Sequence, residues 1–245
     1  METYLQALVA NDPSKLNVAS SLKYTDNGVT AQLGDGLWET ATGIDNTKRL
    51  DFADPVLGNV ASQVVINEGS SGGCGSSGDV IYQVRLKVVQ NQITEIESMT
   101  VRRSGAANGF FSVPNMKPEP VFTQAIPASQ RMSRSELIEV LDLYVDYLEG
   151  SKKGNEVPFD DGCKRYENGV VTANGKASFE MQSMWRFHVT RRYPVIDEEA
   201  GIIWGMLPFE QTANALVVGE AFKIMNGKIM MIQAVMANIP AKTWD

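Results

Sequence analysis

The chain repeats itself over most of its length. The phrase KYTDNGV at residues 23–29 returns as KRYENGV at residues 164–170. An arginine, an aspartate and a glycine recur at one mutual spacing in the two halves: Arg49, Asp54 and Gly58, then Arg192, Asp197 and Gly201. Residues 86–93 are matched in the same way by residues 222–229. A repeat unit of about 110–120 residues is the size of a domain, so each copy can hold its own core and pocket.

The composition is that of an ordinary globular protein. Of the 245 residues, 43% are hydrophobic and 21% are charged, which is enough apolar material for two compact domains. A net charge of −7 without a stripe of Lys or Arg argues against nucleic-acid and anionic-membrane partners, since both need a cationic surface. Two cysteines and one histidine cannot supply the usual structural zinc ligands, and no cofactor fingerprint is present. We therefore expect neither a metal nor an organic cofactor.

The location of the protein is predicted from what its sequence lacks. No run of about eighteen apolar residues predicts a membrane span. The first residues, Met1 to Tyr4, do not show the basic-then-apolar order of a signal peptide. We therefore expect a cytoplasmic protein with reduced cysteines, although a leader already removed from the chain would leave no trace in the sequence.

A proline-rich stretch separates the two halves. Residues 104–131 contain four prolines and show little hydrophobic periodicity, as expected of a linker or a strapping arm. We predict a first domain at residues 1–104, a linker or strap at 105–131 and a second domain at 132–245.

Each half is predicted to begin with a helix and to continue in strands. Ser133 and Glu136 form a capping-box pattern ahead of apolar residues at helical spacing, and residues 3–10 are the counterpart in the first half. The β-like runs of the second half are residues 189–196, 201–209, 215–225 and 228–237, the last two joined by Asn226-Gly227. We predict an α+β fold of two tandem cones, each a curled antiparallel sheet with helices on its concave face.

This element order, present twice, resembles the nuclear transport factor 2-like superfamily, also known as the SnoaL-like or ketosteroid-isomerase-like fold. The resemblance is closest to a two-repeat family of fungal and bacterial proteins of mostly unknown activity. It rests on four segments: residues 24–29, 34–38, 163–170 and 192–201. The resemblance implies the cone fold but not one reaction, because this fold hosts isomerases, dehydratases, epoxide hydrolases, cyclases and non-catalytic adaptors.

His188 is the first candidate for chemistry. It is the single histidine, and an unperturbed imidazole titrates near neutrality, which suits a general acid or base. The position aligned with it in the first half is Asp45. The resemblance favours the catalytic interpretation, because superfamily members often transfer protons with His or a carboxylate in an apolar cone. The alternative is a hydrogen-bonded structural histidine at the start of a strand.

The repeated Arg and Asp residues allow two interpretations. Arg192 and Arg49 could orient a substrate beside Asp197 and Asp54, or each Arg–Asp pair could be a scaffold ion pair that holds a strand bend. Because both halves retain the pattern, we favour the scaffold. Tyr24 and Tyr166 are likewise either hydrogen-bond donors to a ligand or packed aromatics with a bonded hydroxyl.

Aromatic residues that differ between the halves are candidates for the wall of a ligand cavity: Trp38, Trp185, Phe187 and Trp204. Each can equally belong to an ordinary core. The Gly- and Ser-rich residues 69–78 lack the ending of a phosphate loop, so we expect a hairpin loop there.

Two functions are consistent with these observations. The first is a cofactor-independent lyase or isomerase that acts on a small aromatic or polyketide-like hydroxylated molecule, with His188, Tyr24 or Tyr166, and Arg192 as its catalytic groups. Superfamily relatives that release formaldehyde from lignin-derived aromatics suggest cleavage or dehydration of an aromatic alcohol. The second is a non-catalytic binding or dimerisation module whose two copies pack sheet to sheet, with further homo-oligomers open.

Overall fold

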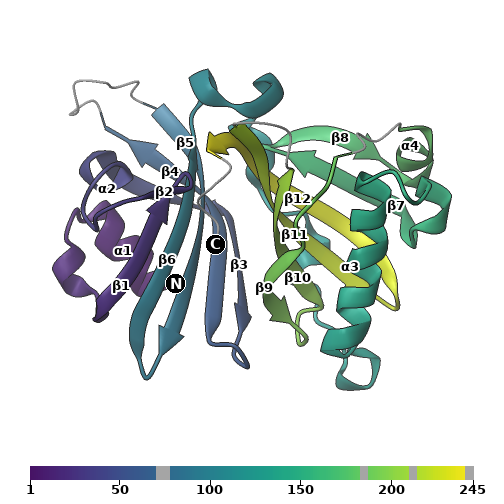
Figure 1. The fold of residues 1–245 in the computed structure, drawn as a ribbon, viewed down its shortest axis with the longest axis horizontal. Coiled ribbons are helices and arrows are strands. Elements are labelled where there is room, and N and C mark those ends of the chain that lie inside the picture. Colours follow the sequence, from purple (N-terminus) through teal and green to yellow (C-terminus); the bar gives the residue numbers. More distant parts are fainter. Residues whose placement is uncertain (70–77, 183–186, 210–213, 241–245) are drawn as a thin grey trace.

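A computed structural model describes residues 1–69, 78–182, 187–209 and 214–240. These residues form two six-stranded sheets, whose strand orders are β2-β1-β6-β5-β4-β3 and β8-β7-β12-β11-β10-β9. The two sheets lie face to face in the middle of the molecule and the helices lie on the outside (Figure 1). The α+β class and the two tandem units predicted from the repeat are confirmed.

The elements of the first half are α1 (Glu2–Val9), β1 (Val18–Asp26), β2 (Val29–Thr30), α2 (Leu37–Thr40), β3 (Ala41–Asp54), β4 (Asn59–Glu68), β5 (Gly78–Val89) and β6 (Gln92–Val101). Those of the second half are α3 (Arg134–Leu148), β7 (Phe159–Glu167), β8 (Val170–Asn174), α4 (Lys176–Met181), β9 (Arg192–Asp197), β10 (Ile202–Phe209), β11 (Asn214–Met225) and β12 (Lys228–Pro240). Short 3₁₀ turns, η2 (Arg103–Gly105) to η6 (Ala128–Gln130), make up much of the linker.

The sheets are mixed rather than wholly antiparallel. The strand that follows the first helix of each half pairs in parallel with the last strand of that half, β1 with β6 and β7 with β12. All other strand pairs are antiparallel, as predicted. The predicted capping box is present, since the Ser133 side chain accepts from the backbone of Glu136 and the Glu136 side chain accepts from the backbone of Ser133.

Strand alternation divides each half between two cores. In β5, Tyr82 and Val84 face the helices of the first half, whereas Ile81 lies in the core between the sheets. In β11, Phe222 faces the helices of the second half and Ala221 faces the first sheet. Each sheet therefore has one face for a cone interior and one for its sister sheet.

The repeated phrase is scaffold. Asn168 is fully buried, and its side chain exchanges two hydrogen bonds of 2.9 Å with the backbone of Met236 on the last strand. Asn27 makes the equivalent pair of bonds to the backbone of Thr100, at 3.3 and 2.9 Å. In both halves the Asn-Gly turn thus fastens β1 or β7 to the strand beside it.

The two repeated aspartates hold the halves together reciprocally. Asp54 accepts the backbone N–H of Ile196 at 3.1 Å, and Asp197 accepts the backbone N–H of Ala53 at 3.2 Å. The second oxygen of each carboxylate accepts from its own turn, at Leu57 and Ala200. The same patch is used on both sides, as in an isologous dimer interface.

The prediction of an Arg–Asp ion pair within each repeat is wrong, although these arginines and aspartates do have structural roles. Arg49 pairs with Glu2 and Asp51 rather than Asp54, and Asp54 pairs instead with Arg134 of α3. The equal spacing of Arg and Asp in the two halves reflects the pseudo-symmetric contact between the halves. The sequence of either copy alone does not reveal this contact.

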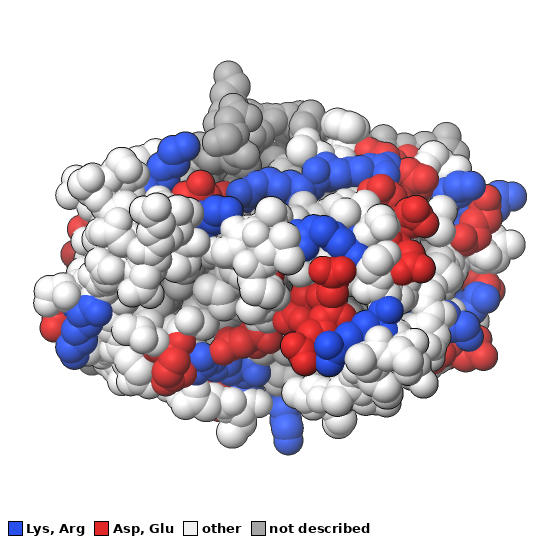
Figure 2. Space-filling model, turned by 90° about the horizontal axis from the view of Figure 1, so that it is seen from below, with Lys and Arg blue, Asp and Glu red and all other residues white. Residues whose placement is uncertain are grey.

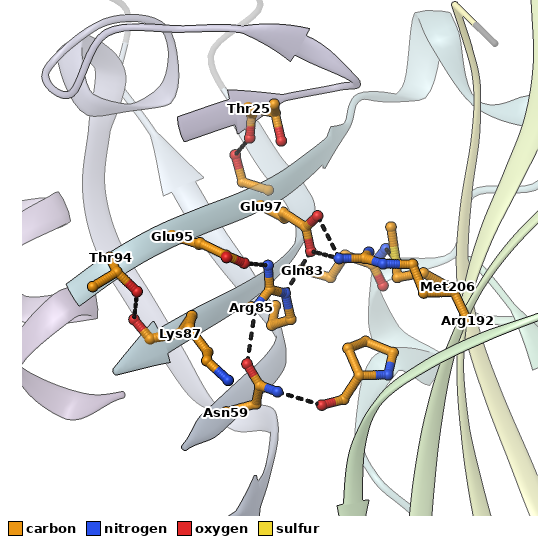
Figure 3. A network of polar contacts seen from close by, with 12 residues as sticks. Thr25, Asn59, Gln83, Arg85, Lys87, Thr94, Glu95, Glu97, Arg192 and Met206 are labelled. Atoms are coloured by element: carbon orange, nitrogen blue, oxygen red, sulfur yellow. Dashed lines mark hydrogen bonds and ion pairs between the residues drawn. The ribbon is translucent and has the colours of Figure 1, made fainter. Parts of the chain in front are cut away.

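A partly buried ion pair connects the two halves next to these contacts (Figure 3). Arg192 donates to both carboxylate oxygens of Glu97, at 2.7 and 3.0 Å, and Glu97 also binds Arg85. Asn59 accepts from Arg85 at 2.8 Å and donates to the carbonyl of Pro194 at 2.7 Å. Arg192 is therefore a bridge between the sheets.

The outer surface shows no single sign of charge on the face seen in Figure 2, where Lys and Arg side chains lie between Asp and Glu side chains. Among the described residues, no helix is both long enough and apolar enough to cross a membrane.

We predict that Asp197→Ala lowers the free energy of unfolding by about 2 kcal/mol, because two backbone N–H groups lose their acceptor. Urea unfolding monitored by fluorescence measures the change. Asp51→Ala is the control and should cost less than about 1 kcal/mol, because its partner Arg49 stays paired with Glu2 at the surface. Equal losses of stability in the two variants would contradict a structural role for the reciprocal aspartate contacts.

Candidate functional site

The second half encloses a cavity of about 350 Å³ between α3, the sheet and the linker. One part of its wall is apolar: Phe110, Leu148, Phe209, Leu216, Val218 and Met236. The other part is polar: Asn108, Tyr144, Arg165, Glu167, Thr172, Gln182 and Glu220. This volume is at the lower end of the range of small-molecule pockets, and the wall has their usual mixture of apolar surface and a few polar groups.

Glu220 is the central polar group of this cavity. It lies in the middle of β11, a strand of otherwise mostly apolar residues, and is only 2% exposed. The Tyr144 hydroxyl donates to its Oε1 at 3.2 Å. Its Oε2 has no hydrogen-bond partner in the described part of the chain. A buried polar atom left unpaired on a cavity wall is a feature that a ligand can satisfy.

Burial raises the pKa of Glu220 to about 8, with the nearby Glu167 carboxylate adding to the effect and Arg165 opposing it. At neutral pH the side chain is thus mostly a protonated acid. Since Oε1 accepts from Tyr144, the proton belongs on Oε2. The polar part of the cavity wall therefore contains an acidic O–H group.

Arg165 organises the rest of the polar wall. It is 5% exposed and donates to the Tyr144 hydroxyl at 3.2 Å, to Thr172 at 3.0 Å and to Gln182 at 2.9 Å. Its Nε lies 3.6 Å from Oε1 of Glu167. Although burial lowers the pKa of Arg165, Tyr144 and the two carboxyls raise it overall, so the side chain stays charged.

Strand periodicity explains why these groups meet. Arg165 and Glu167 are two residues apart on β7, so both point into the cone, whereas Tyr166 between them points the other way. Tyr144 and Leu148 are one helical turn apart on α3 and share the face that lies over the sheet.

The structure places His188 away from this cavity. Its side chain is 70% exposed, and Nδ1 lies 3.0 Å from Oε1 of Glu149 at the surface. His188 is not among the described residues that line the cavity. The expectation of a histidine inside the cone thus differs from its observed position, because the residues on either side of Thr190, Val189 and Arg191, bind Glu149 and Asp146 at the polar side of α3.

The two candidate tyrosines have different environments. Tyr166 donates to Glu119 of the linker at 2.6 Å and packs against the core between the sheets. Tyr24 is 5% exposed in the interior of the first half. Strand pairing matches Tyr24 with Arg165, not with Tyr166, because Tyr24 pairs with Ile96 and Arg165 with the equivalent Ile232.

The other candidates among the described residues also lie outside the cavity. Trp204 packs on Phe52 between the sheets, with ring centroids 5.9 Å apart. Phe187 is half-buried and is not among the described lining residues. Arg49 and Arg192 are tied to carboxylates, as described above. Trp185 and most of the Gly- and Ser-rich loop lie outside the described residues.

The interior of the first half is filled with aromatic side chains. Trp38 and Tyr4 meet edge to face at 5.5 Å, and the Tyr4 and Tyr82 hydroxyls bond at 2.9 Å. All three side chains are at most 1% exposed. The strand position equivalent to Glu220 is Val84, since Val84 pairs with Ser98 and Glu220 with the equivalent Ala234. The acid of the second half thus has no counterpart there.

Sequence reasoning missed Glu220, Arg165 and Tyr144. One signal was available for Glu220, because it is a single carboxylate in the apolar run ALVVGEAF at residues 215–222. Within the described residues, no group of three His, Cys, Asp or Glu side chains is placed to hold a metal.

Comparison with known proteins gave limited matches. Residues 130–236, which include the cavity-lining residues other than Asn108 and Phe110, match a family described as a domain of unknown function, DUF8021. The comparison with curated proteins gave no match.

Among solved structures, similar chains include a candidate ketosteroid isomerase from Kribbella flavida, with 12% identity, a TM-score of 0.35, 42% of this chain covered and 78% of that one. A de novo designed protein with a curved β-sheet has 16% identity and a TM-score of 0.35, with 42% and 87% covered. A LEH-like epoxide hydrolase from M. tuberculosis has 15% identity and a TM-score of 0.34, with 42% and 83% covered.

The raised pKa of Glu220 makes stability depend on pH. Between about 4.5 and about 8 the folded protein holds a proton on Glu220 that the unfolded chain releases, so the free energy of unfolding falls as pH rises through this range. We predict that wild type loses stability relative to Glu220→Gln over this range, because the Gln variant lacks the titrating proton. Urea unfolding at several pH values measures the difference.

Glu199→Gln is the matched control, since this carboxylate is 80% exposed. The difference between wild type and Glu199→Gln should stay nearly constant across the same pH range. A constant difference between wild type and Glu220→Gln would instead show that Glu220 titrates normally.

Proposed function

We propose that the second half is a cofactor-independent acid–base catalyst, a lyase or isomerase for a small, neutral, hydroxylated substrate. The observation that carries the proposal is the buried Glu220 carboxyl, which belongs to the cavity wall and whose Oε2 has no hydrogen-bond partner among the described residues. A neutral acid in such a site can donate a hydrogen bond or a proton to a substrate oxygen. The resemblance to the nuclear transport factor 2-like superfamily agrees with chemistry of this kind.

The two carboxyls of the cavity have complementary environments. Glu220 is buried and its pKa is raised to about 8, whereas Glu167 is partly exposed and lies 3.6 Å from Nε of Arg165. Two carboxyls separated in this way are suited to acid and base roles. In a dehydration, Glu167 accepts a proton from carbon while Glu220 protonates the departing hydroxyl, so that the C–O bond breaks and water leaves.

The preferred substrate is an aromatic alcohol activated by a neighbouring carbonyl or phenol. Acid–base groups typically supply a factor of about 10² to 10⁴ in rate, so the substrate must already be reactive. The apolar wall with Phe110 and Phe209 suits an aromatic or polyketide-like body. Cleavage that releases formaldehyde from an aromatic diol is the related alternative within this class.

For the first half we propose a non-catalytic role. Its interior is filled by Tyr4, Trp38 and Tyr82, and Val84 occupies the position of the acid. The reciprocal Asp contacts support a pseudo-dimer in which this half holds the other in place.

A test uses aryl β-hydroxy ketones such as 4-hydroxy-4-phenylbutan-2-one, whose dehydration gives an enone that is followed by ultraviolet absorbance. We predict that Glu220→Gln lowers the rate by about 10² to 10⁴, because the acidic proton is lost. The wild-type rate should fall as pH rises through about 8, as Glu220 ionises.

His188→Ala is the control and should leave the rate unchanged, since His188 lies at the surface. Loss of activity in His188→Ala with full activity in Glu220→Gln would reverse the assignment. No turnover of any such ketone by the wild-type protein would contradict the proposed reaction class.

A further inference from the structure

The linker between the halves forms one wall of the cavity. It is anchored at two points on the second half: Ala106 forms an antiparallel bridge with Ala237, and the N–H of Ser112 donates to the carbonyl of Asn168 at 2.8 Å. Gly169 permits the second contact, because a Cβ there would lie 2.0 Å from the Ser112 carbonyl oxygen. Asn108 and Phe110, which lie between the two anchors, line the cavity.

A tight reversal directs this segment. Asn108 and Gly109 both have left-handed backbones, with φ of 54° and 71°. Two successive residues of this kind turn the chain sharply, so that Phe110 follows directly after the turn. Ala107 is buried against Val218, Ala234 and Met236, and Phe110 packs on the same cluster while lining the cavity.

The next residue, Phe111, packs in a different part of the molecule. Its ring lies under the guanidinium of Arg103, 4.8 Å from the ring centroid, and packs on the core between the sheets. Phe111 is not among the described residues that line the cavity containing Glu220. Two adjacent phenylalanines of the linker thus form a natural pair for comparison.

We infer that Phe110 determines which ligands the cavity accepts. The Phe110 ring sets the length of the apolar end of the cavity, which lies opposite the polar wall. The ligand it selects is a neutral aromatic molecule that offers an oxygen acceptor to Oε2 of Glu220. The inference rests on the proposed function only in that the ligand occupies the same cavity. The inference also explains a use of the tandem arrangement, since the segment that carries Phe110 follows directly after the last strand of the first half.

The test compares two neutral aryl ketones of different length: acetophenone and the fluorescent naphthyl ketone 6-propionyl-2-dimethylaminonaphthalene. Binding of the long ketone is followed by its fluorescence, and that of acetophenone by displacement. We expect Phe110→Ala to raise affinity for the long ketone about tenfold relative to acetophenone, since pocket size discriminates by about 10- to 200-fold per methylene. Phe110→Trp should shift the ratio in the opposite direction.

Phe111→Ala is the matched control and should leave the ratio of the two affinities unchanged. Phe110→Leu covers the case in which the alanine variant does not fold, and near-ultraviolet circular dichroism verifies folding. The inference is overturned if Phe110 variants and Phe111→Ala shift the ratio equally, or if no Phe110 variant shifts it.

The closing measurement separates this inference from the proposed function. The infrared band of the protonated Glu220 carboxyl, identified as the band that Glu220→Gln removes, should shift when either ketone binds. A shifted band with an unchanged ratio in the Phe110 variants would overturn the role of Phe110 alone. A band that neither ketone shifts would overturn ligand binding at Glu220, and with it both proposals.

Discussion

The face-to-face packing of two sheets is the contact on which the rest of the structure depends. Each sheet gives one face to this shared core, so its helices must lie on the other face, where they close a cone. Asp54 and Asp197 fix the alignment, because each carboxylate binds both its own turn and the backbone of the opposite sheet. Apolar contact alone has little direction, whereas these hydrogen bonds specify one register.

Within this frame, the two halves use their cone interiors differently. The first half fills the space with large aromatic side chains, which adds dispersion and hydrophobic stabilisation. The second half also packs aromatic side chains beneath α3, but it places Glu220 and Arg165 beside them. Burying ionisable groups costs stability unless they are paired, and Tyr144 and Arg165 provide part of that pairing while Oε2 of Glu220 is left open. A half that is stabilised elsewhere can carry such a site.

Sequence periodicity predicted α1, α3 and the strands β9 to β12. It failed where a side chain's face depends on one step of register. Tyr24 and Tyr166 looked equivalent because both are tyrosines in the repeated phrase, yet strand pairing matches Tyr24 with Arg165. Adjacent strand residues face opposite sides of a sheet. A difference of one residue therefore places Arg165 inside the cone and leaves Tyr166 on the other side, in contact with the linker. His188 was singled out by its chemistry, which carries no information about its exposure.

The sequence by itself determined that the chain is two copies of one α+β unit, because repeats and hydrophobic periodicity are local properties that each copy displays independently. Only the tertiary structure decided which residues line the cavity beneath α3. Glu220, Arg165 and Tyr144 come from three separate elements, and Phe110 comes from the linker. Their chemistry arises from burial and mutual contact: the pKa of Glu220 is raised because the folded chain removes it from water, and no neighbour in sequence could do that.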